Sequence, residues 1–234
     1  MKLVIKNLKK NFGSKEVLKD IDFEFTSGKI YGLLGRNGAG KTTLFNCLNE
    51  DLDVDAGEFY IMDGEKRKIE SKDIGYVLST PVVPEFLTGR EFLKFFIDIN
   101  KDNITDIKTI DEYFDLVKIE PEDRDKLMKD YSHGMKNKVQ MLVHIIASPS
   151  ILLLDEPLTS FDVVVAEEMK ELLKKLKKGH ILIFSTHIME LALDLCDEIV
   201  VLNNGTLESI DKSNMNNDKF KEKIINVLKG EENA

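Results

Sequence analysis

Cysteine, proline and long apolar runs are scarce in this sequence of 234 residues. Its two cysteines, Cys47 and Cys196, stand far apart and outside any metal-ligand spacing, so we expect both to fill the core. Five prolines, with 42% hydrophobic and 32% charged residues, exclude a disordered or low-complexity chain. No stretch approaches the roughly 18 apolar residues that span a bilayer, and "MKLVIKNLKK" lacks the apolar core of a secretory signal. We therefore expect a cytosolic protein, and any membrane that it serves must be crossed by another chain.

Basic residues are also fewer than acidic ones, with 33 Lys and Arg against 42 Asp and Glu. The formal net charge is -9, which disfavours binding to DNA or RNA over a broad surface, because that binding relies on Lys and Arg displacing counterions. A run of lysines at 174, 175, 177 and 178 is expected to form a solvated helix face. With a prior of roughly 150 residues per domain, one domain with an appended lobe fits the length best.

Two kinds of strand follow one another in the first 35 residues. "LVIKNL" has strand character, and "IDFEF" alternates Ile21, Phe23 and Phe25 with acidic residues, as in a half-buried antiparallel strand. "KIYGLLG" is almost continuously apolar, as expected of a strand covered on both faces. Similar runs recur at "ILLLDE", "ILIFSTH" and "EIVVLNNG". A helix from Val164 to Lys178 lies between two of them, with Gly179 as its stop. This alternation predicts an α/β fold with a mostly parallel sheet and an N-terminal antiparallel portion.

Residues 85–147 break the alternation. "EFLTGREFLKFFIDIN", "TIDEYFDLV" and "MKNKVQMLVHIIA" all read as helices. We therefore predict a single domain, 1–234, in which a helical subdomain (85–147) is inserted into a core made of 1–84 and 148–210. Residues 211–234 are assigned to a C-terminal helix. Its apolar residues between Asn216 and Leu228 recur at helical spacing, which suits local packing or a contact with a partner: Phe220, Ile224, Val227 and Leu228.

A phosphate loop is the most specific motif. "GRNGAGKTT" matches G-x-x-x-x-G-K-[ST] from Gly35 to Thr42, between a buried strand and a helix expected to begin near Lys41. Glycines let backbone N–H groups turn toward an anion, and the helix dipole adds positive charge. Lys41 would reach the β- and γ-phosphates and Thr42 would bind Mg²⁺. A glycine turn that only precedes a helix is the alternative. The expected nucleotide-binding residues are Gly35, Arg36, Asn37, Gly38, Ala39, Gly40, Lys41, Thr42 and Thr43.

Two carboxylates and a histidine end two other strands. Asp155 and Glu156 close "ILLLDE", at the carboxyl end of a buried strand, where ligands of open α/β sheets lie. Asp155 suits the magnesium, and Glu156 suits the attacking water. His187 follows "ILIFST" and reaches the same edge, where it would contact the γ-phosphate. The alternatives are a charged strand cap and a structural histidine.

"YSHGM" gives a second candidate anion site. Ser132, His133 and Gly134 stand at the start of a helix, where free N–H groups and a hydroxyl suit a γ-phosphate. Taken alone, the segment favours a Ser-capped helix over an anion site.

In this order the motifs resemble the ATP-binding cassette of ABC transporters over nearly the whole chain, with a P-loop NTPase core. "GRNGAGKTT" resembles the Walker A loop, "ILLLDE" Walker B with its catalytic glutamate, and "STH" the switch-histidine loop. "YSHGM" resembles the family signature, usually leucine, serine, two glycines and glutamine; Ser132 and Gly134 match, whereas Tyr131, His133 and Met135 depart.

The resemblance implies catalytic roles for Glu156, His187 and Lys41, and Mg²⁺ held by Thr42 and Asp155. It also implies an ATP-dependent homodimer or heterodimer in which Ser132, His133, Gly134 and Asp162, the last residue of the D-loop-like "SFD", reach the other subunit's ATP.

Two further residues take roles from the resemblance. Phe12 matches the aromatic that stacks on adenine, with core packing as the alternative. Ser79 stands where the family has a glutamine that touches Mg²⁺ and senses the membrane subunit. A serine hydroxyl could ligate the metal only through a water or a shifted backbone, so the resemblance implies altered coupling but intact hydrolysis.

The implied function is an ATPase subunit, peripherally attached to the inner face of the cell membrane, that drives a separate permease and is most like exporter cassettes. Residues 81–100 would receive the permease or simply build the lobe's core. A soluble ABC-type ATPase acting on ribosomes or DNA is the alternative, but only about ninety residues separate Lys41 from Ser132, too few for the long coiled-coil insertion usual in such proteins. A GTPase is disfavoured because no N-K-x-D motif is present.

Overall fold

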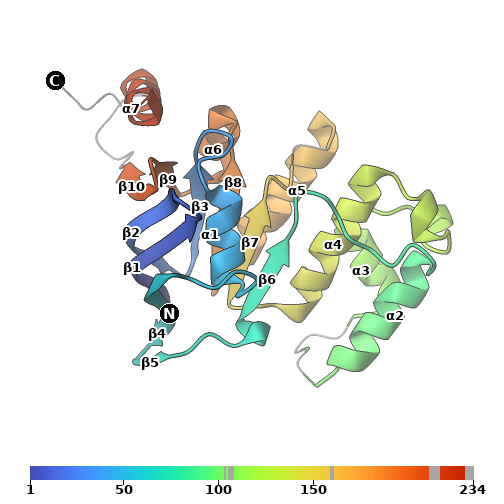
Figure 1. Cartoon of the computed structure of the whole chain (residues 1–234). Helices are drawn as coiled ribbons and strands as arrows, with labels where there is room; N and C mark the ends of the chain where they lie inside the picture. The colour runs from blue at the N-terminus through green and yellow to red at the C-terminus, as the bar shows by residue number, and fades with distance from the viewer. Residues whose placement is uncertain (103, 105–107, 159–160, 211–216, 230–234) are drawn as a thin grey trace.

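The computed structural model describes residues 1–102, 104, 108–158, 161–210 and 217–229. These residues form a small antiparallel sheet, a larger and mostly parallel sheet, and a group of helices beside the larger sheet (Figure 1). The predicted α/β fold with an N-terminal antiparallel portion and an inserted helical part is therefore confirmed. No helix within the described ranges is long and apolar enough to cross a bilayer.

The antiparallel sheet has the order β2-β1-β4-β5. Its strands are β1 (Lys2–Phe12), β2 (Lys15–Thr26), β4 (Ala56–Asp63) and β5 (Glu65–Arg67). On β2, Ile21 and Phe25 are buried and Phe23 is half-buried, whereas Asp22 and Glu24 are exposed. The period-2 pattern of "IDFEF" therefore places one face of the strand on the core.

The larger sheet has the order β10-β9-β3-β8-β7-β6. Its strands are β3 (Lys29–Leu34), β6 (Ile74–Val77), β7 (Ile151–Asp155), β8 (Ile181–Thr186), β9 (Glu198–Asn203) and β10 (Thr206–Ile210). All neighbours are parallel except β10, which pairs antiparallel with β9. Because β3, β7 and β8 are parallel, their carboxyl ends meet at one edge of the sheet.

The two faces of the larger sheet belong to different cores. On β8, Ile181 and Ile183 pack with helix α1 (Lys41–Leu48) and the antiparallel sheet. The alternate residues Leu182 and Phe184 pack against the helices of the lobe and α5 (Val163–Leu176). The same alternation on β7 decides which side chains at the strand ends face α1.

The helical lobe contains α2 (Gly89–Asn100), α3 (Ile110–Leu116) and α4 (His133–Ala147). Short 3₁₀ turns accompany them at Pro121–Asp123 and Met128–Asp130, and a third, Ser71–Asp73, directly precedes β6. The three predicted helices are confirmed, but α2 begins at Gly89, not Glu85. Thr88 is its N-cap: the hydroxyl accepts from the N–H of Glu91, whose carboxylate accepts from the N–H of Thr88. This capping box sets the start of the helix.

Helices α6 (Met189–Leu195) and α7 (Asn217–Lys229) pack on the β9 side of the sheet. Phe220 and Ile224 of α7 are buried there, so local packing is confirmed for part of the predicted tail. Asn216, with residues 211–215 and 230–234 of the predicted C-terminal segment, lies outside the described residues. Cys47 is buried, and burial raises the pKa of its thiol to about 11, as expected of an inert core cysteine.

Candidate functional site

A cavity of 480 Å³ opens at the carboxyl end of β3. Its walls come from the β1-β2 hairpin, the glycine loop, α1 and the end of β7. The volume falls within the range of roughly 300–1,000 Å³ that is usual for small-molecule sites. The residues that line it are Phe12, Lys15, Val17, Asn37, Gly38, Gly40, Lys41, Thr42, Thr43 and Glu156. Because residues of the glycine loop that is predicted to bind nucleotide line this cavity, we call it the nucleotide pocket.

The glycine loop has the backbone that an anion site requires. Gly38 and Gly40 have φ values of 78° and 107°, in the left-handed region that favours glycine. A Cβ on Gly40 would also lie only 2.9 Å from Cγ1 of Val17. Gly40 is the N-cap of α1, so the loop delivers backbone N–H groups to the start of a helix, where phosphate binds.

Lys41 begins α1 beneath this loop, where the helix was expected to start. Its ammonium is almost fully buried and donates to the carbonyl oxygens of Gly35 at 2.8 Å and Arg36 at 3.4 Å. Burial lowers the pKa of Lys41, and the carboxylates of Glu156 and Asp155 oppose that shift. A cation held by loop carbonyls, with little water around it, is poised to turn to a phosphate.

Asp155 and Thr42 meet at the edge of the sheet. The Thr42 hydroxyl donates to Oδ2 of Asp155 at 2.9 Å, although 113 positions separate the two residues. A hydroxyl and a carboxylate are hard oxygen donors, and Mg²⁺ is usually held by one or two such groups together with substrate phosphates and water. The described residues contain no cluster of three or more His, Cys, Asp and Glu that could hold a metal without a substrate. The pair therefore fits a magnesium ion that arrives with a nucleotide.

Glu156 and His187 form a second pair across the ends of β7 and β8. Nδ1 of His187 lies 3.0 Å from Oε1 of Glu156. Glu156 has φ 49°, a left-handed conformation that costs a non-glycine residue roughly 1–3 kcal/mol. Its N–H donates to the carbonyl oxygen of Ser185 at 3.2 Å. This turn ends the strand and lets Glu156 line the nucleotide pocket directly after Asp155.

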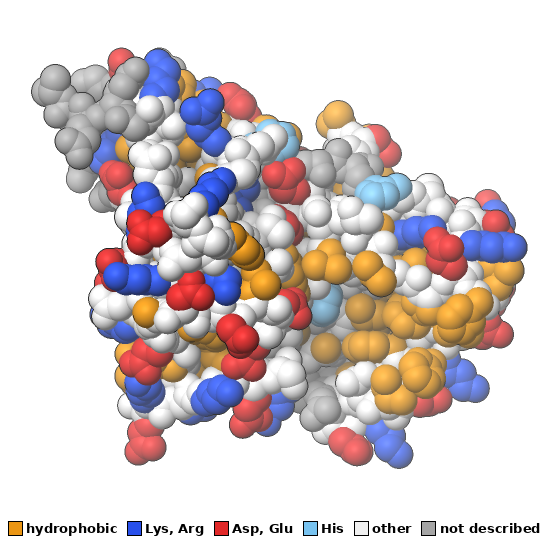
Figure 2. Space-filling model, in the orientation of Figure 1, with side chains coloured by type: hydrophobic (Ala, Val, Ile, Leu, Met, Phe, Trp, Pro, Cys, Tyr) orange, Lys and Arg blue, Asp and Glu red, His pale blue; other side chains and the backbone are white. Residues whose placement is uncertain are grey.

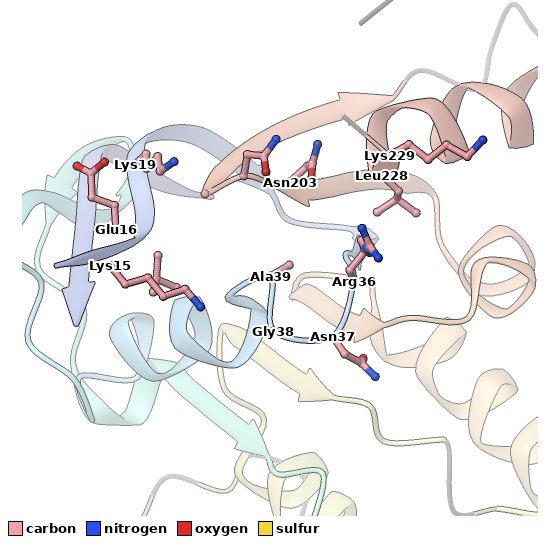
Figure 3. A pocket seen from close by; sticks show the side chains of 13 residues that line it. Lys15, Glu16, Lys19, Arg36, Asn37, Gly38, Ala39, Asn203, Leu228 and Lys229 are labelled. Atoms are coloured by element: carbon pink, nitrogen blue, oxygen red, sulfur yellow. The ribbon is translucent and has the colours of Figure 1, made fainter. Parts of the chain in front are cut away.

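Arg36 and Ala39 lie on the other side of the loop. They line a neighbouring cavity of 420 Å³ together with the β9-β10 turn and the end of α7 (Figure 3). In that view Arg36 extends toward Leu228, whereas Asn37 extends the opposite way. Asn37 and Gly38 line both cavities. Of the loop residues expected to bind nucleotide, Gly35, Arg36 and Ala39 are not among the residues that line the nucleotide pocket.

The residues expected to act across a dimer lie outside the lining of the nucleotide pocket. Ser132 and His133 are exposed, and Ser132 Oγ caps α4 by accepting from the N–H of Met135 at 3.2 Å. Gly134 packs near the ring of Phe161. Asp162 caps α5 in the same manner, through N–H groups of the following helix turn. Ser160 of "SFD" lies outside the described residues.

Phe12 and Ser79 lie differently with respect to the nucleotide pocket. Phe12 is 49% exposed and lines the nucleotide pocket, so core packing does not account for it. Ser79 is exposed two residues beyond the end of β6, and it is absent from the residues that line the pocket. Sequence reasoning missed Lys15 and Val17, which line the pocket from β2. Their only signal was their closeness to Phe12 along the chain.

Comparison with known proteins shows the family of this chain. The family model described as ABC transporter matches residues 18–159. An uncharacterized ABC transporter ATP-binding protein of Bacillus subtilis, YdbJ, is 32% identical over 99% of this chain and 76% of its own length. Another from Methanocaldococcus jannaschii is 36% identical over 87% of this chain and 75% of its own. A sulfate/thiosulfate import ATP-binding protein of Synechocystis is 32% identical over 90% of this chain but 60% of its own length.

Two solved structures share the fold. An ATP-binding subunit of an ABC transporter superposes with a TM-score of 0.78 at 22% identity, over 96% of this chain and all of that one. A dimeric ATP-binding cassette in a post-hydrolysis state, bound to ADP and Pi, gives a TM-score of 0.74 at 22% identity, over 89% of this chain and 99% of that one. At this identity the likeness establishes the fold alone.

Proposed function

Because this chain belongs to the ABC transporter family of ATP-binding proteins and is an ATPase, we propose that it works as a dimer. Two copies of it, or one copy and a close relative, close over ATP and drive a separate membrane permease. The proposal extends to the site residues. The nucleotide pocket takes ATP, with the base against Phe12 and the triphosphate in the glycine loop. The subunit lies at the inner face of the cell membrane, attached through the permease.

Within one subunit, each group at the sheet edge has a chemical task. Lys41 leaves the loop carbonyls and neutralises charge on the β- and γ-phosphates. Thr42 and Asp155 would hold Mg²⁺, which when bound would supply positive charge to the phosphates. Glu156 accepts a hydrogen bond from the attacking water and orients it, while His187 holds the carboxylate in place.

The position of Ser132 is the observation that carries the dimer. The nucleotide pocket is walled by the hairpin, the glycine loop and Glu156, whereas Ser132 and His133 stand exposed on the lobe and do not line it. A helix start with free N–H groups favours a negative charge. The subunit's own pocket does not supply that charge, so a nucleotide on a second subunit is the occupant we propose.

The permease would dock on the lobe. Large apolar side chains are exposed there: Val82 at 73%, Phe86 at 79%, Phe95 at 56% and Ile99 at 63%. Figure 2 shows hydrophobic side chains gathered over the lobe. Such a patch on a protein surface marks an interaction site. Other residues of α2, such as the buried Leu93, build the lobe's core, so in this proposal the exposed side chains of the segment 81–100 receive the permease and its buried ones pack inside the lobe.

The experiment measures ATP hydrolysis and dimerisation of the chain on the same samples. ATPase activity per molecule should rise with protein concentration, and light scattering should detect a dimer with ATP but not with ADP. Activity per molecule that stays constant down to the lowest dilution, without any association, overturns the dimer. Purification from cells should bring down an integral membrane protein, and this should be lost when Phe86 and Phe95 are replaced by Ser. Co-purifying ribosomes or DNA would instead support the soluble alternative.

The expected exporter role has less support, because the relatives include a sulfate/thiosulfate import protein. It is tested in inverted vesicles that contain the co-purified permease. An exporter accumulates its substrate inside these vesicles when ATP is added outside.

A further inference from the structure

We propose that Ser185 is a positioning residue that holds the carboxylate of Asp155 and the main chain of Glu156 in their working orientation. This inference rests on the roles proposed above for those two residues. It concerns the last residue but one of β8, which has contacts with the main chain or side chain of each of them.

Strand register places Ser185 beside Asp155. The two residues are direct partners in the parallel pairing of β7 and β8. Both continue the face of the sheet that packs on α1, since Leu153 and Ile183, two residues earlier on each strand, belong to that core. Thr42 of α1 reaches Asp155 from the same side. A single hydroxyl at this point of β8 is therefore next to the proposed metal ligand.

The hydroxyl of Ser185 donates a short hydrogen bond to Oδ1 of Asp155. Both groups are buried, Ser185 completely and Asp155 to 5% exposure. A hydrogen bond to a carboxylate is strong and geometrically restrictive at such a buried site. The two oxygens of Asp155 are thus divided, with Oδ1 held by Ser185 and Oδ2 by Thr42.

This division has a consequence for metal binding. A Thr42 hydroxyl that ligated Mg²⁺ through a lone pair could still donate its proton to Oδ2, so the contact of Ser185 with Oδ1 would complement that bond. Ser185 would then fix the rotation of the Asp155 carboxylate from the oxygen that Thr42 does not contact. Groups that orient a metal ligand in this way affect metal affinity or activity by roughly 10- to 100-fold.

Ser185 also holds the backbone of Glu156. The N–H of Glu156 lies 3.2 Å from both the hydroxyl and the carbonyl oxygen of Ser185. This bifurcated contact fixes the residue in its left-handed turn at φ 49°. Two residues further along the chain, His187 contacts the Glu156 side chain. The end of β8 therefore supports Glu156 at both its main chain and its carboxylate.

The test compares three variants at neighbouring positions. Ser185→Ala removes the hydroxyl, and Ser185→Thr keeps it. Thr186→Val is the matched control, because Thr186 is equally buried on the same strand but faces the other side, where its hydroxyl accepts from the N–H of Ile188 at 3.0 Å. Ser185→Cys, which keeps the shape with a weak donor, serves as the second hydroxyl-free variant should the alanine variant fold poorly.

Two measurements are made on each variant of the full chain. Binding of Mn²⁺ together with a non-hydrolysable ATP analogue is followed by electron paramagnetic resonance, and steady-state ATP hydrolysis gives kcat and KM. We expect Ser185→Ala and Ser185→Cys to weaken Mn²⁺ binding about 10-fold or more and to lower kcat about as much, with KM for ATP little changed. Ser185→Thr should restore both quantities, and Thr186→Val should leave Mn²⁺ binding unaltered.

Asp155→Asn distinguishes failure of the proposed metal site from failure of the proposed role of Ser185. If Asp155→Asn leaves Mn²⁺ binding intact, the proposed metal site is wrong whatever Ser185 does. If it abolishes binding while Ser185→Ala and Ser185→Cys bind and hydrolyse as the unchanged protein does, the positioning role of Ser185 is overturned. An equal loss of Mn²⁺ binding in Thr186→Val would also overturn it, since it would indicate a general effect of disturbing β8.

Discussion

His187 Nδ1 lies 3.0 Å from Glu156 Oε1, across the ends of two strands that are adjacent in the sheet but 31 positions apart in the chain. A carboxylate oxygen only accepts hydrogen bonds, so Nδ1 of the imidazole carries the proton in this contact. The histidine therefore fixes the direction of the carboxylate. The contact ties the loop that follows β8 to the residue proposed to position the attacking water.

Replacing Glu156 by Gln should separate binding from chemistry. The amide keeps the size of the side chain and can still contact His187, but it is a far weaker base. ATP affinity should stay within about 3-fold, while turnover should fall about 100-fold or more, the usual contribution of a general base. A stable dimer with ATP should accumulate in size-exclusion chromatography. Glu190→Gln, an exposed change on α6, is the control, and undiminished turnover in Glu156→Gln would remove this residue from the mechanism.

Phe12 should contribute to binding the base but not the phosphates. Its half-exposed ring lines the nucleotide pocket, and stacking of a base on an aromatic side chain contributes about 1–3 kcal/mol. Phe12→Ala should therefore weaken ATP about 10-fold, at 1.4 kcal/mol for each factor of ten, and Phe12→Tyr should not. Inorganic triphosphate should bind both variants as it binds the unchanged protein. An equal loss of triphosphate and ATP in a fluorescence titration would show that Phe12 does not act by stacking.

Local sequence was sufficient for the parts of the site that one segment builds. Strand, glycine loop and helix follow one another directly, so the start of α1 at Lys41 and the end of β7 at Asp155 were predictable. The direction of side chains around the loop was not. Arg36 stands inside the motif and still lines the neighbouring cavity, because the path of the loop depends on what packs on either side of it.

Contacts between residues of distant segments could not be predicted from the sequence, because they depend on how those segments pack together. No role is assigned to Ser185 from the sequence alone. Its side chain nevertheless points to the same face of the strand as Ile181 and Ile183, which pack against α1. Its role depends on the register between β7 and β8, which no single strand encodes. Lys15 and Val17 depend likewise on how the β1-β2 hairpin lies against the glycine loop.

Ser132→Arg should block closure of the dimer without affecting the subunit's own pocket. Ser132 is exposed on the lobe, so a long cation there fills the space that a second subunit's nucleotide would occupy. ATP binding by the monomer should stay unchanged, while ATP-dependent association in light scattering and turnover should both be lost. Ser71→Arg, at another exposed serine, should dimerise normally. A Ser132→Arg protein that still dimerises on ATP would contradict the cross-subunit role.

His144 should make the stability of the protein depend on pH. It lies on α4, half-buried, and burial lowers the pKa of its imidazole below the ordinary value of 6.5, although a hydrogen bond with the backbone of Tyr76 opposes the shift. The folded protein therefore binds this proton less readily than the unfolded chain does. The free energy of unfolding is therefore unaffected by this group above pH 6.5. It decreases as the pH falls below 6.5 toward the lowered pKa of the folded state, because the unfolded chain then binds the proton first.

His144→Gln keeps a hydrogen-bond donor and removes the titration. One such group changes the free energy of unfolding by at most about 1.4 kcal/mol per pH unit. In urea denaturation without nucleotide, between pH 7.5 and 5, the free energy of unfolding of His144→Gln should decline less steeply than that of the unchanged protein. His133→Gln, at an exposed histidine of the same helix, should follow the unchanged protein. Parallel curves for His144→Gln and the unchanged protein would mean that burial does not depress this pKa, since the histidine would then bind its proton equally in the folded and unfolded states.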